Sequence, residues 1–224
     1  MKNIILKLII VIAVPSLLMA QTWNFNSIAD GYVPGDLIVT NGAVQNSGSG
    51  SGGSGYFSGD ALNFFGFGTR SVTMPAVNTA GGGSTLAFKM IYGNNSNGGE
   101  LLDSGENVAL YYSTNGGSTW TKHTDFALNT YQQSSYTAVS INLTGNLAAS
   151  SIIFKLEQVS HSGPQFDQWA IDDLVLNTTD VTAPTITATA VASDNSTISV
   201  TFSEAVYTAT GANTAVVVGD FALS

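Results

Sequence analysis

Apolar and polar side chains alternate with a period of two along most of this chain. The clearest case is 84–92, where Leu86, Phe88, Met90 and Tyr92 would share one side of an extended strand. Because successive side chains of a strand point to opposite faces, this spacing predicts strands with one buried face. From Gln21 onward, no stretch of the chain shows a convincing helical period. About ten short strands separated by glycine-rich turns follow from this pattern, at 22–26, 37–40, 61–66, 70–74, 84–92, 108–112, 119–122, 137–143, 151–156 and 168–176.

Strands of this number and length predict an all-β fold, a jelly-roll β-sandwich over residues 21–178. The Gly and Ser run at 47–55 predicts a flexible surface loop inside it, because nothing in that run can pack. A polar stretch that ends at Pro184 separates this domain from two further strands. We expect residues 179–224 to hold only the first part of a second β-domain, since an Ig-sized sandwich takes about 100 residues.

The first segment of the chain has the pattern of an export signal. Lys2 and Lys7 precede a short apolar run that reaches Val14, Pro15 breaks the run, and Ala20 precedes the expected cleavage point. The run is too short for a comfortable membrane span. We therefore expect 1–20 to be a signal peptide and the mature chain to be secreted or displayed at the cell surface, without a membrane span. A retained N-terminal anchor is the alternative.

The composition narrows the range of partners. The chain has 224 residues, only 9% of them charged, and no cysteine, which excludes disulfides and cysteine-ligated zinc. Without residues 1–20, four bases remain against 15 acids. Such an acidic surface repels phosphate backbones, so nucleic acid is not an expected partner. The same surface suits divalent cations.

Two adjacent carboxylates, Asp172 and Asp173, interrupt the apolar run 168–176. An unpaired charge in a buried strand is costly, and no base is close by in the sequence. A bound cation is the simplest remaining reason for one of the two acids. Strand alternation would point Asp173 to the other face, so Asp172 is the first candidate ligand.

The segment 113–120 (Ser-Thr-Asn-Gly-Gly-Ser-Thr-Trp) matches the Asp-box pattern, with Asn115 in place of Asp. Asn and two glycines predict a tight hairpin turn, and Trp120 would fold back to cover it. A sialidase blade would need several copies of this pattern and a cluster of arginines. The chain has one copy and one arginine, Arg70, so the local structural role is favoured.

Three segments together resemble the subrepeats of reelin-type domains: the hairpin at 106–120, the run 163–174 (Gly-Pro-Gln-Phe-Asp-Gln-Trp-Ala-Ile-Asp-Asp-Leu), and 59–66 with Arg70. The resemblance covers roughly 22–177. It implies a jelly-roll sandwich with a bound calcium ion, used in extracellular recognition rather than catalysis. Residues 180–206 are similar to the start of a bacterial Ig-like domain.

Calcium takes several oxygen ligands from carboxylates and carbonyls. In related jelly rolls a metal ligand comes from the final strand, beside the first strand, which again selects Asp172. The resemblance makes Asp60 and Glu106 the next candidate metal ligands, because they lie next to the matching strands. Asn24 and Asn26 could add oxygens. The alternative is that all these acids are solvated edge residues.

Catalytic constellations are missing from the sequence. The two histidines, His123 and His161, are isolated, and nothing singles out a carboxylate pair such as Glu100 and Glu157. We therefore expect no enzyme activity. The chain is predicted to be a recognition or adhesion module of a larger secreted or surface protein, with a structural calcium ion and an extracellular protein or glycan as ligand.

A carbohydrate-binding module appended to a secreted enzyme is the alternative, because one sandwich fold serves both functions. Exposed aromatic side chains would favour sugar, since rings stack on pyranose faces. The candidates are Tyr56, Phe57, Tyr131 and Tyr136, which could equally be ordinary loop or core residues.

Overall fold

The computed structural model describes residues 7–12, 20–45, 57, 60–97, 99–178, 185–194 and 196–203. The chain forms two compact units. The larger is Ala20–Thr179, and the smaller combines Met1–Met19 with Asp180–Ser224. Among the described residues, no helix has the length and hydropathy needed to cross a membrane.

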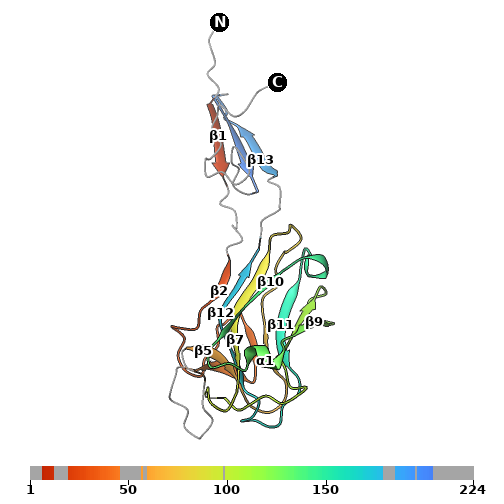
Figure 1. The fold of residues 1–224 in the computed structure, drawn as a ribbon. Helices are drawn as coiled ribbons and strands as arrows, with labels where there is room; N and C mark the ends of the chain where they lie inside the picture. The colour runs from red at the N-terminus through yellow and green to blue at the C-terminus, as the bar shows by residue number, and fades with distance from the viewer. Residues whose placement is uncertain are drawn as a thin grey trace. The chain divides into compact units, whose positions relative to one another are not determined.

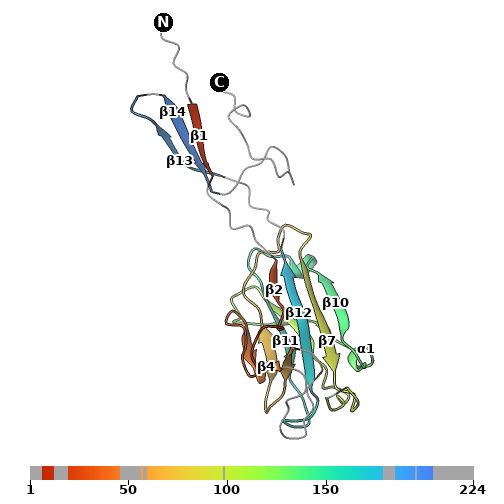
Figure 2. The same cartoon turned by 90° about the vertical axis from the view of Figure 1, so that its left-hand side faces the viewer.

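The larger unit is a sandwich of two antiparallel sheets that face each other (Figures 1 and 2). We call them the β12 sheet, with strand order β10-β7-β12-β5-β4 and β2 added beside β12, and the β11 sheet, with order β3-β6-β11-β8-β9. The predicted all-β sandwich is confirmed. The β12 sheet contains β2 (Gln21–Trp23), β4 (Gly42–Gln45), β5 (Ala61–Phe64), β7 (Thr85–Tyr92), β10 (Thr137–Asn142) and β12 (Trp169–Asn177). The β11 sheet contains β3 (Ile38–Thr40), β6 (Arg70–Thr73), β8 (Ala109–Ser113), β9 (Thr121–Asp125) and β11 (Ile153–Gln158).

Among the described residues of this unit, helical structure is limited to two short turns, α1 (Leu128–Tyr131) and the 3-10 turn η1 (Gly145–Leu147). Strand β4 is the element that the period-two pattern did not predict. Its first residue, Gly42, lies so close to Phe64 of β5 that a Cβ there would come within 2.7 Å of the Phe64 ring. A glycine permits this approach because it has no side chain.

The core lies between the sheets and follows the predicted alternation. On β7, Leu86, Phe88 and Met90 are buried while Lys89 is exposed. Phe64 of β5 and Trp169 of β12 are direct cross-strand neighbours whose rings stack, with centroids 3.7 Å apart and planes 8° from parallel. Burial of such a ring contributes about 1.5–3 kcal/mol, so this pair is a main anchor of the β12 sheet.

Strand β12 departs from the predicted alternation at Asp172 and Asp173, where it contains a β-bulge. Asp172 lies opposite Lys89, but Val175 lies opposite Ala87, so β12 has one residue more than its partner over this interval. Asp173 absorbs it with a left-handed φ of 48°. Its carboxylate does not point to the opposite face: Asp173 Oδ2 is 2.6 Å from Nζ of Lys89, the exposed residue opposite Asp172.

The smaller unit contains a hairpin of β13 (Ile186–Val191) and β14 (Thr197–Phe202). Strand β1 (Lys7–Ile12) pairs with β14 in parallel. This strand falls within the predicted signal peptide, so removal of 1–20 would leave that edge of β14 without this partner. Residues 204–224 of the predicted Ig-like segment lie outside the described residues.

The bulge predicts how substitutions at Asp173 affect stability. Asp173→Val should lower the free energy of unfolding by about 1 kcal/mol more than Asp173→Asn, because a β-branched residue tolerates left-handed φ poorly and Asn tolerates it well. Both variants lose the exposed ion pair with Lys89, so Asn is the matched control. Urea denaturation measures the difference, and equal stabilities would contradict the assigned conformation.

Candidate functional site

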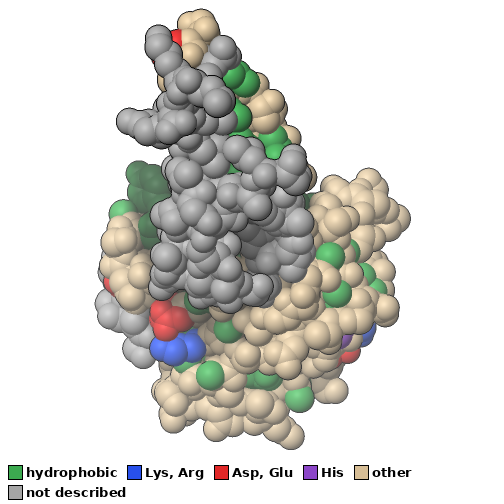
Figure 3. Space-filling view, turned by 90° about the horizontal axis from the view of Figure 1, so that it is seen from above, with side chains coloured by type: hydrophobic (Ala, Val, Ile, Leu, Met, Phe, Trp, Pro, Cys, Tyr) green, Lys and Arg blue, Asp and Glu red, His purple; other side chains and the backbone are tan. Residues whose placement is uncertain are grey.

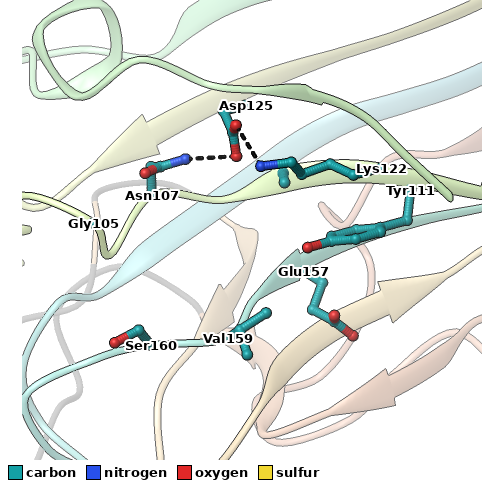
Figure 4. A pocket seen from close by; sticks show the side chains of 9 residues that line it. Gly105, Asn107, Tyr111, Lys122, Asp125, Glu157, Val159 and Ser160 are labelled. Carbon is teal, nitrogen blue, oxygen red and sulfur yellow. Dashed lines mark hydrogen bonds and ion pairs between the residues drawn. The ribbon is translucent and has the colours of Figure 1, made fainter. Parts of the chain in front are cut away.

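A pocket of about 250 Å³ lies on the outer face of the β11 sheet, over β8, β9 and β11 (Figure 4). Strand alternation builds it. Tyr111 and Glu157 follow the buried Leu110 and Leu156, so their side chains leave the core face and point outward. The residues that line it are Gly105, Asn107, Ala109, Tyr111, Lys122, Asp125, Glu157, Val159 and Ser160.

Each charged group that lines the pocket has a partner of opposite charge. Lys122 Nζ lies 2.7 Å from Asp125 Oδ2, and Asn107 Nδ2 donates to Asp125 Oδ1 at 3.0 Å (Figure 4). Hydrogen bonding and charge from Asp125 raise the pKa of the exposed Lys122. Glu157 accepts from Lys155 Nζ at 2.5 Å. The pocket therefore offers many hydrogen-bonding atoms and little unbalanced charge.

Aromatic rings frame Lys155. Its Nζ lies 4.4 Å from the ring centre of Trp120 and 5.3 Å from that of Tyr111, within the range of cation–π attraction. Figure 4 shows the Tyr111 hydroxyl directed into the pocket, between Lys122 and Glu157. Tyr111 thus presents both an apolar ring and a polar tip to a ligand.

The Asp-box hairpin lies beside this frame and has the local role predicted for it. Ser113 Oγ accepts the amides of Asn115 and Gly117 at 3.3 and 2.9 Å, and Asn115 Oδ1 accepts the amide of Thr119 at 3.0 Å. These bonds close the turn between β8 and β9. The turn delivers Trp120 to its position under Lys155.

A second group of functional side chains surrounds Arg70, which is fully buried at the start of β6. Its guanidinium donates to the Gly66 carbonyl at 3.1 and 3.2 Å and to the Gly163 carbonyl at 2.7 Å. Further bonds run to the carbonyls of Phe166 and Asp167, both at 2.9 Å. Burial lowers the pKa of Arg70 to about 10, against the opposing effect of Asp167 and Glu106. Arg70 thus ties the loop 65–69 to the loop 159–168.

Three carboxylates gather at the same loops. Glu100 Oε2 accepts the Asp167 amide at 2.8 Å, and Glu106 Oε1 accepts the Ser162 hydroxyl at 2.9 Å. Burial raises the pKa of Glu100, the hydrogen bond from the Asp167 amide opposes this rise, and the negative charges of Asp167 and Asp103 add to it. Burial also raises the pKa of Glu106, again helped by Asp167. Of the candidate metal ligands from the sequence, only Glu106 belongs to this group.

The other two candidate ligands lie elsewhere. Asp172 Oδ1 accepts the Asp173 amide at 2.7 Å. Burial raises the pKa of Asp172, opposed by this bond and by one from the Phe25 backbone. Asp60 immediately precedes β5. Across the described part of the chain, no three His, Cys, Asp or Glu side chains are grouped so that they could hold a metal ion, and the assignment of calcium to Asp172, Asp60 and Glu106 stays a prediction.

The aromatic residues that the sequence suggested for sugar stacking have other positions. Phe57 is buried, and the Tyr131 ring packs against Tyr92 and Phe126 at 5.6 Å each. Burial raises the pKa of the Tyr136 hydroxyl. Tyr56 lies outside the described residues.

The sequence did not single out the aromatic side chains that the described surface does expose, Tyr32, Phe67 and Phe166, nor the pocket residue Tyr111. The alternation of β8 could have identified Tyr111, because it places this side chain on the outer face of the sheet. Among the coloured atoms of Figure 3, few belong to charged side chains.

The fold and the pocket define a two-sheet β-sandwich that carries an open, polar surface site. The chain belongs to the reelin subrepeat B family, whose model matches residues 45–177. No curated protein matches the chain.

Several solved structures are similar to this chain at low identity. The K1 cleaved adhesin domain of Lys-gingipain from Porphyromonas gingivalis W83 is 13% identical, with 72% of this chain and 99% of that chain covered and a TM-score of 0.45. A family 35 carbohydrate-binding module from Paenibacillus barcinonensis is 15% identical, with coverages of 71% and 99% and a TM-score of 0.38. The C-terminal family 6 module of LamC, a laminarinase from Zobellia galactanivorans, is 14% identical, with coverages of 70% and 98% and a TM-score of 0.37.

The raised pKa of Glu106 predicts a pH dependence of stability. The usual glutamate pKa is 4.5, and the folded state raises it, so Glu106 stabilises the fold most when protonated and loses this contribution as the pH rises through its folded pKa. Glu106→Gln is neutral at every pH. Its stability relative to the wild type should therefore increase from pH 4 to pH 7, as measured by urea denaturation. A constant or falling difference would contradict this assignment.

Proposed function

We propose that this chain is a non-catalytic recognition module that acts outside the cell and binds its ligand in the pocket over β8, β9 and β11. The observation that carries the proposal is the pairing of the pocket's charged groups. Lys122 is matched to Asp125 and Lys155 to Glu157. A site of this kind offers a ligand hydrogen-bonding atoms in fixed positions, but it has no unpaired charged side chain that could act as an acid, base or nucleophile.

A glycosidase would place two carboxyl groups in such a pocket, and Asp125 and Glu157 both line it. One of the two must carry a proton to act as a general acid. Here both carboxylates are already engaged in ion pairs, Asp125 with Lys122 at 2.7 Å and Glu157 with Lys155 at 2.5 Å. The arrangement supports binding rather than hydrolysis.

The pocket favours a neutral glycan as the ligand, which keeps the carbohydrate-binding module as the second candidate. Tyr111 supplies an apolar ring, while Asn107, Asp125 and Lys122 supply polar atoms that hydroxyl groups can match. A volume of about 250 Å³ suits a group of the size of one sugar ring. A small, polar region of a protein surface is the other ligand that this geometry accepts.

A glycan array with the purified chain tests this proposal. We expect binding of neutral oligosaccharides with a dissociation constant in the millimolar range or below. Tyr111→Ala should weaken binding about tenfold by removing the ring, whereas Tyr111→Phe keeps the ring and should retain most of the affinity. Tyr32→Ala, an exposed tyrosine in another loop, is the control.

Two outcomes would count against this reading. If the chain binds no glycan on the array, the carbohydrate-binding alternative is excluded and a protein remains as the ligand. Hydrolysis of a bound oligosaccharide that is lost in Glu157→Gln would overturn the non-catalytic assignment.

Calcium stabilisation stays a prediction of this proposal. The melting temperature should rise in calcium chloride relative to EDTA, since an ion that binds only the folded state contributes about 2.7 kcal/mol at 100-fold excess over its dissociation constant. If Asp172 is a ligand, Asp172→Ala removes most of the rise; if Glu106 is, Glu106→Gln removes it. Asp173→Asn is the control. An unchanged melting temperature would rule out a structural calcium ion.

A further inference from the structure

Two phenylalanine rings project from the loops that Arg70 ties together. Phe67 is 75% exposed in the loop between β5 and β6, and Phe166 is 48% exposed in the loop between β11 and β12. Leu101 is 36% exposed and directly follows Glu100, whose carboxylate holds the Asp167 amide beside Phe166. We call Phe67, Leu101 and Phe166 the aromatic loop surface.

The loops beneath these rings are fixed by hydrogen bonds. The Gly66 amide donates to the Pro164 carbonyl at 2.7 Å, and His161 Nε2 lies 2.8 Å from the Gly68 carbonyl. His161 Nδ1 accepts the Gly163 amide at 3.2 Å, so Nε2 carries the proton and donates to Gly68. On the other side, Asn41 Nδ2 donates to the Phe67 and Thr69 carbonyls at 2.5 and 2.9 Å. The rings therefore stand on preorganised backbone, which lowers the entropy cost of binding.

The charges beside the aromatic loop surface are mostly acidic. Glu100 and Glu106 hold the amide of Asp167 and the hydroxyl of Ser162, which lie in the same loop as Phe166. Asp103 is joined to Glu106, whose Oε2 accepts its amide at 3.0 Å. The cation in this region, Arg70, is buried and directs its guanidinium to backbone carbonyls and Gln158. A ligand that covers the rings therefore meets the exposed Asp103 and the half-buried carboxylates of Glu100 and Glu106.

We propose that the aromatic loop surface binds a protein segment in which lysine or arginine alternates with apolar residues. The apolar side chains would cover Phe67, Leu101 and Phe166, and the cations would pair with Glu100 and Glu106. Lysine and arginine also place their alkyl stems on aromatic rings, so one partner chemistry satisfies both parts of the surface. This inference rests on the proposed recognition function and adds a second surface, distinct from the Tyr111 pocket.

Other ligands fit this surface less well. Nucleic acid and anionic lipid would meet repulsion from the carboxylates. A neutral sugar would leave Glu100 and Glu106 without charged partners. Phenylalanine also lacks the hydroxyl group that lets Tyr111 combine stacking with hydrogen bonding.

The test is a titration of the isotope-labelled chain with a short synthetic peptide of alternating lysine and leucine, followed by NMR. We expect saturable shifts at the backbone amides of 66–69, 100–106 and 161–167, and weaker binding as salt is added. A peptide of alternating glutamate and leucine should not bind, and the glutamine analogue should bind more weakly. Phe67→Ala should weaken binding of the lysine peptide about tenfold.

Two matched variants separate this surface from the pocket. Tyr32→Ala and Tyr111→Ala should leave the peptide affinity unchanged, and Phe67→Ala should leave any glycan affinity unchanged. No saturable binding at millimolar peptide, equal binding of the glutamate peptide, or an unchanged affinity in Phe67→Ala would overturn the proposal. Each of those results leaves the pocket's function to be judged by the glycan array alone.

Discussion

The buried guanidinium of Arg70 is the interaction on which the loop end of the sandwich depends. It donates hydrogen bonds to four backbone carbonyls and to Gln158, which would otherwise need water as a donor. These groups lie inside the protein, where an unpaired charge or carbonyl is costly. Arginine suits this place because its planar group has five donors in fixed directions. Loops without a core of their own thereby acquire the order that a binding surface needs.

The period-two pattern was sufficient to predict most strands of the two sheets, because it shows directly which side chains of a strand are buried. Strand β7 is the clearest example, since its core residues and its exposed Lys89 alternate as the sequence predicts. The pattern failed at Asp172 and Asp173 for a physical reason. A β-bulge changes the alternation at one point, and the lysine that neutralises Asp173 comes from β7, far away in the sequence. Asp173 is therefore paired with a lysine although no basic residue lies near it in the sequence.

The site was harder to predict than the fold. Composition does not tell which aromatic residues face the solvent: Phe57 is buried and Tyr131 packs on the core, whereas Phe67 is exposed because its loop is held outward by Arg70 and Asn41. The resemblance to reelin-type subrepeats correctly indicated the family, which covers 45–177. It selected Glu106 as a candidate metal ligand, but it did not select Glu100 or Asp167, which lie at the same loops.

The strand order of the β12 sheet has a consequence for how the protein is made. The pairs β4–β5 and β7–β10 are joined only through β12, among the described strands, and β2 pairs with β12 as well. The last strand of the domain to be synthesised is thus the one that unites the sheet. Until it emerges, the earlier strands lack their central partner, so the domain stays open during translation and closes in a late, non-local step.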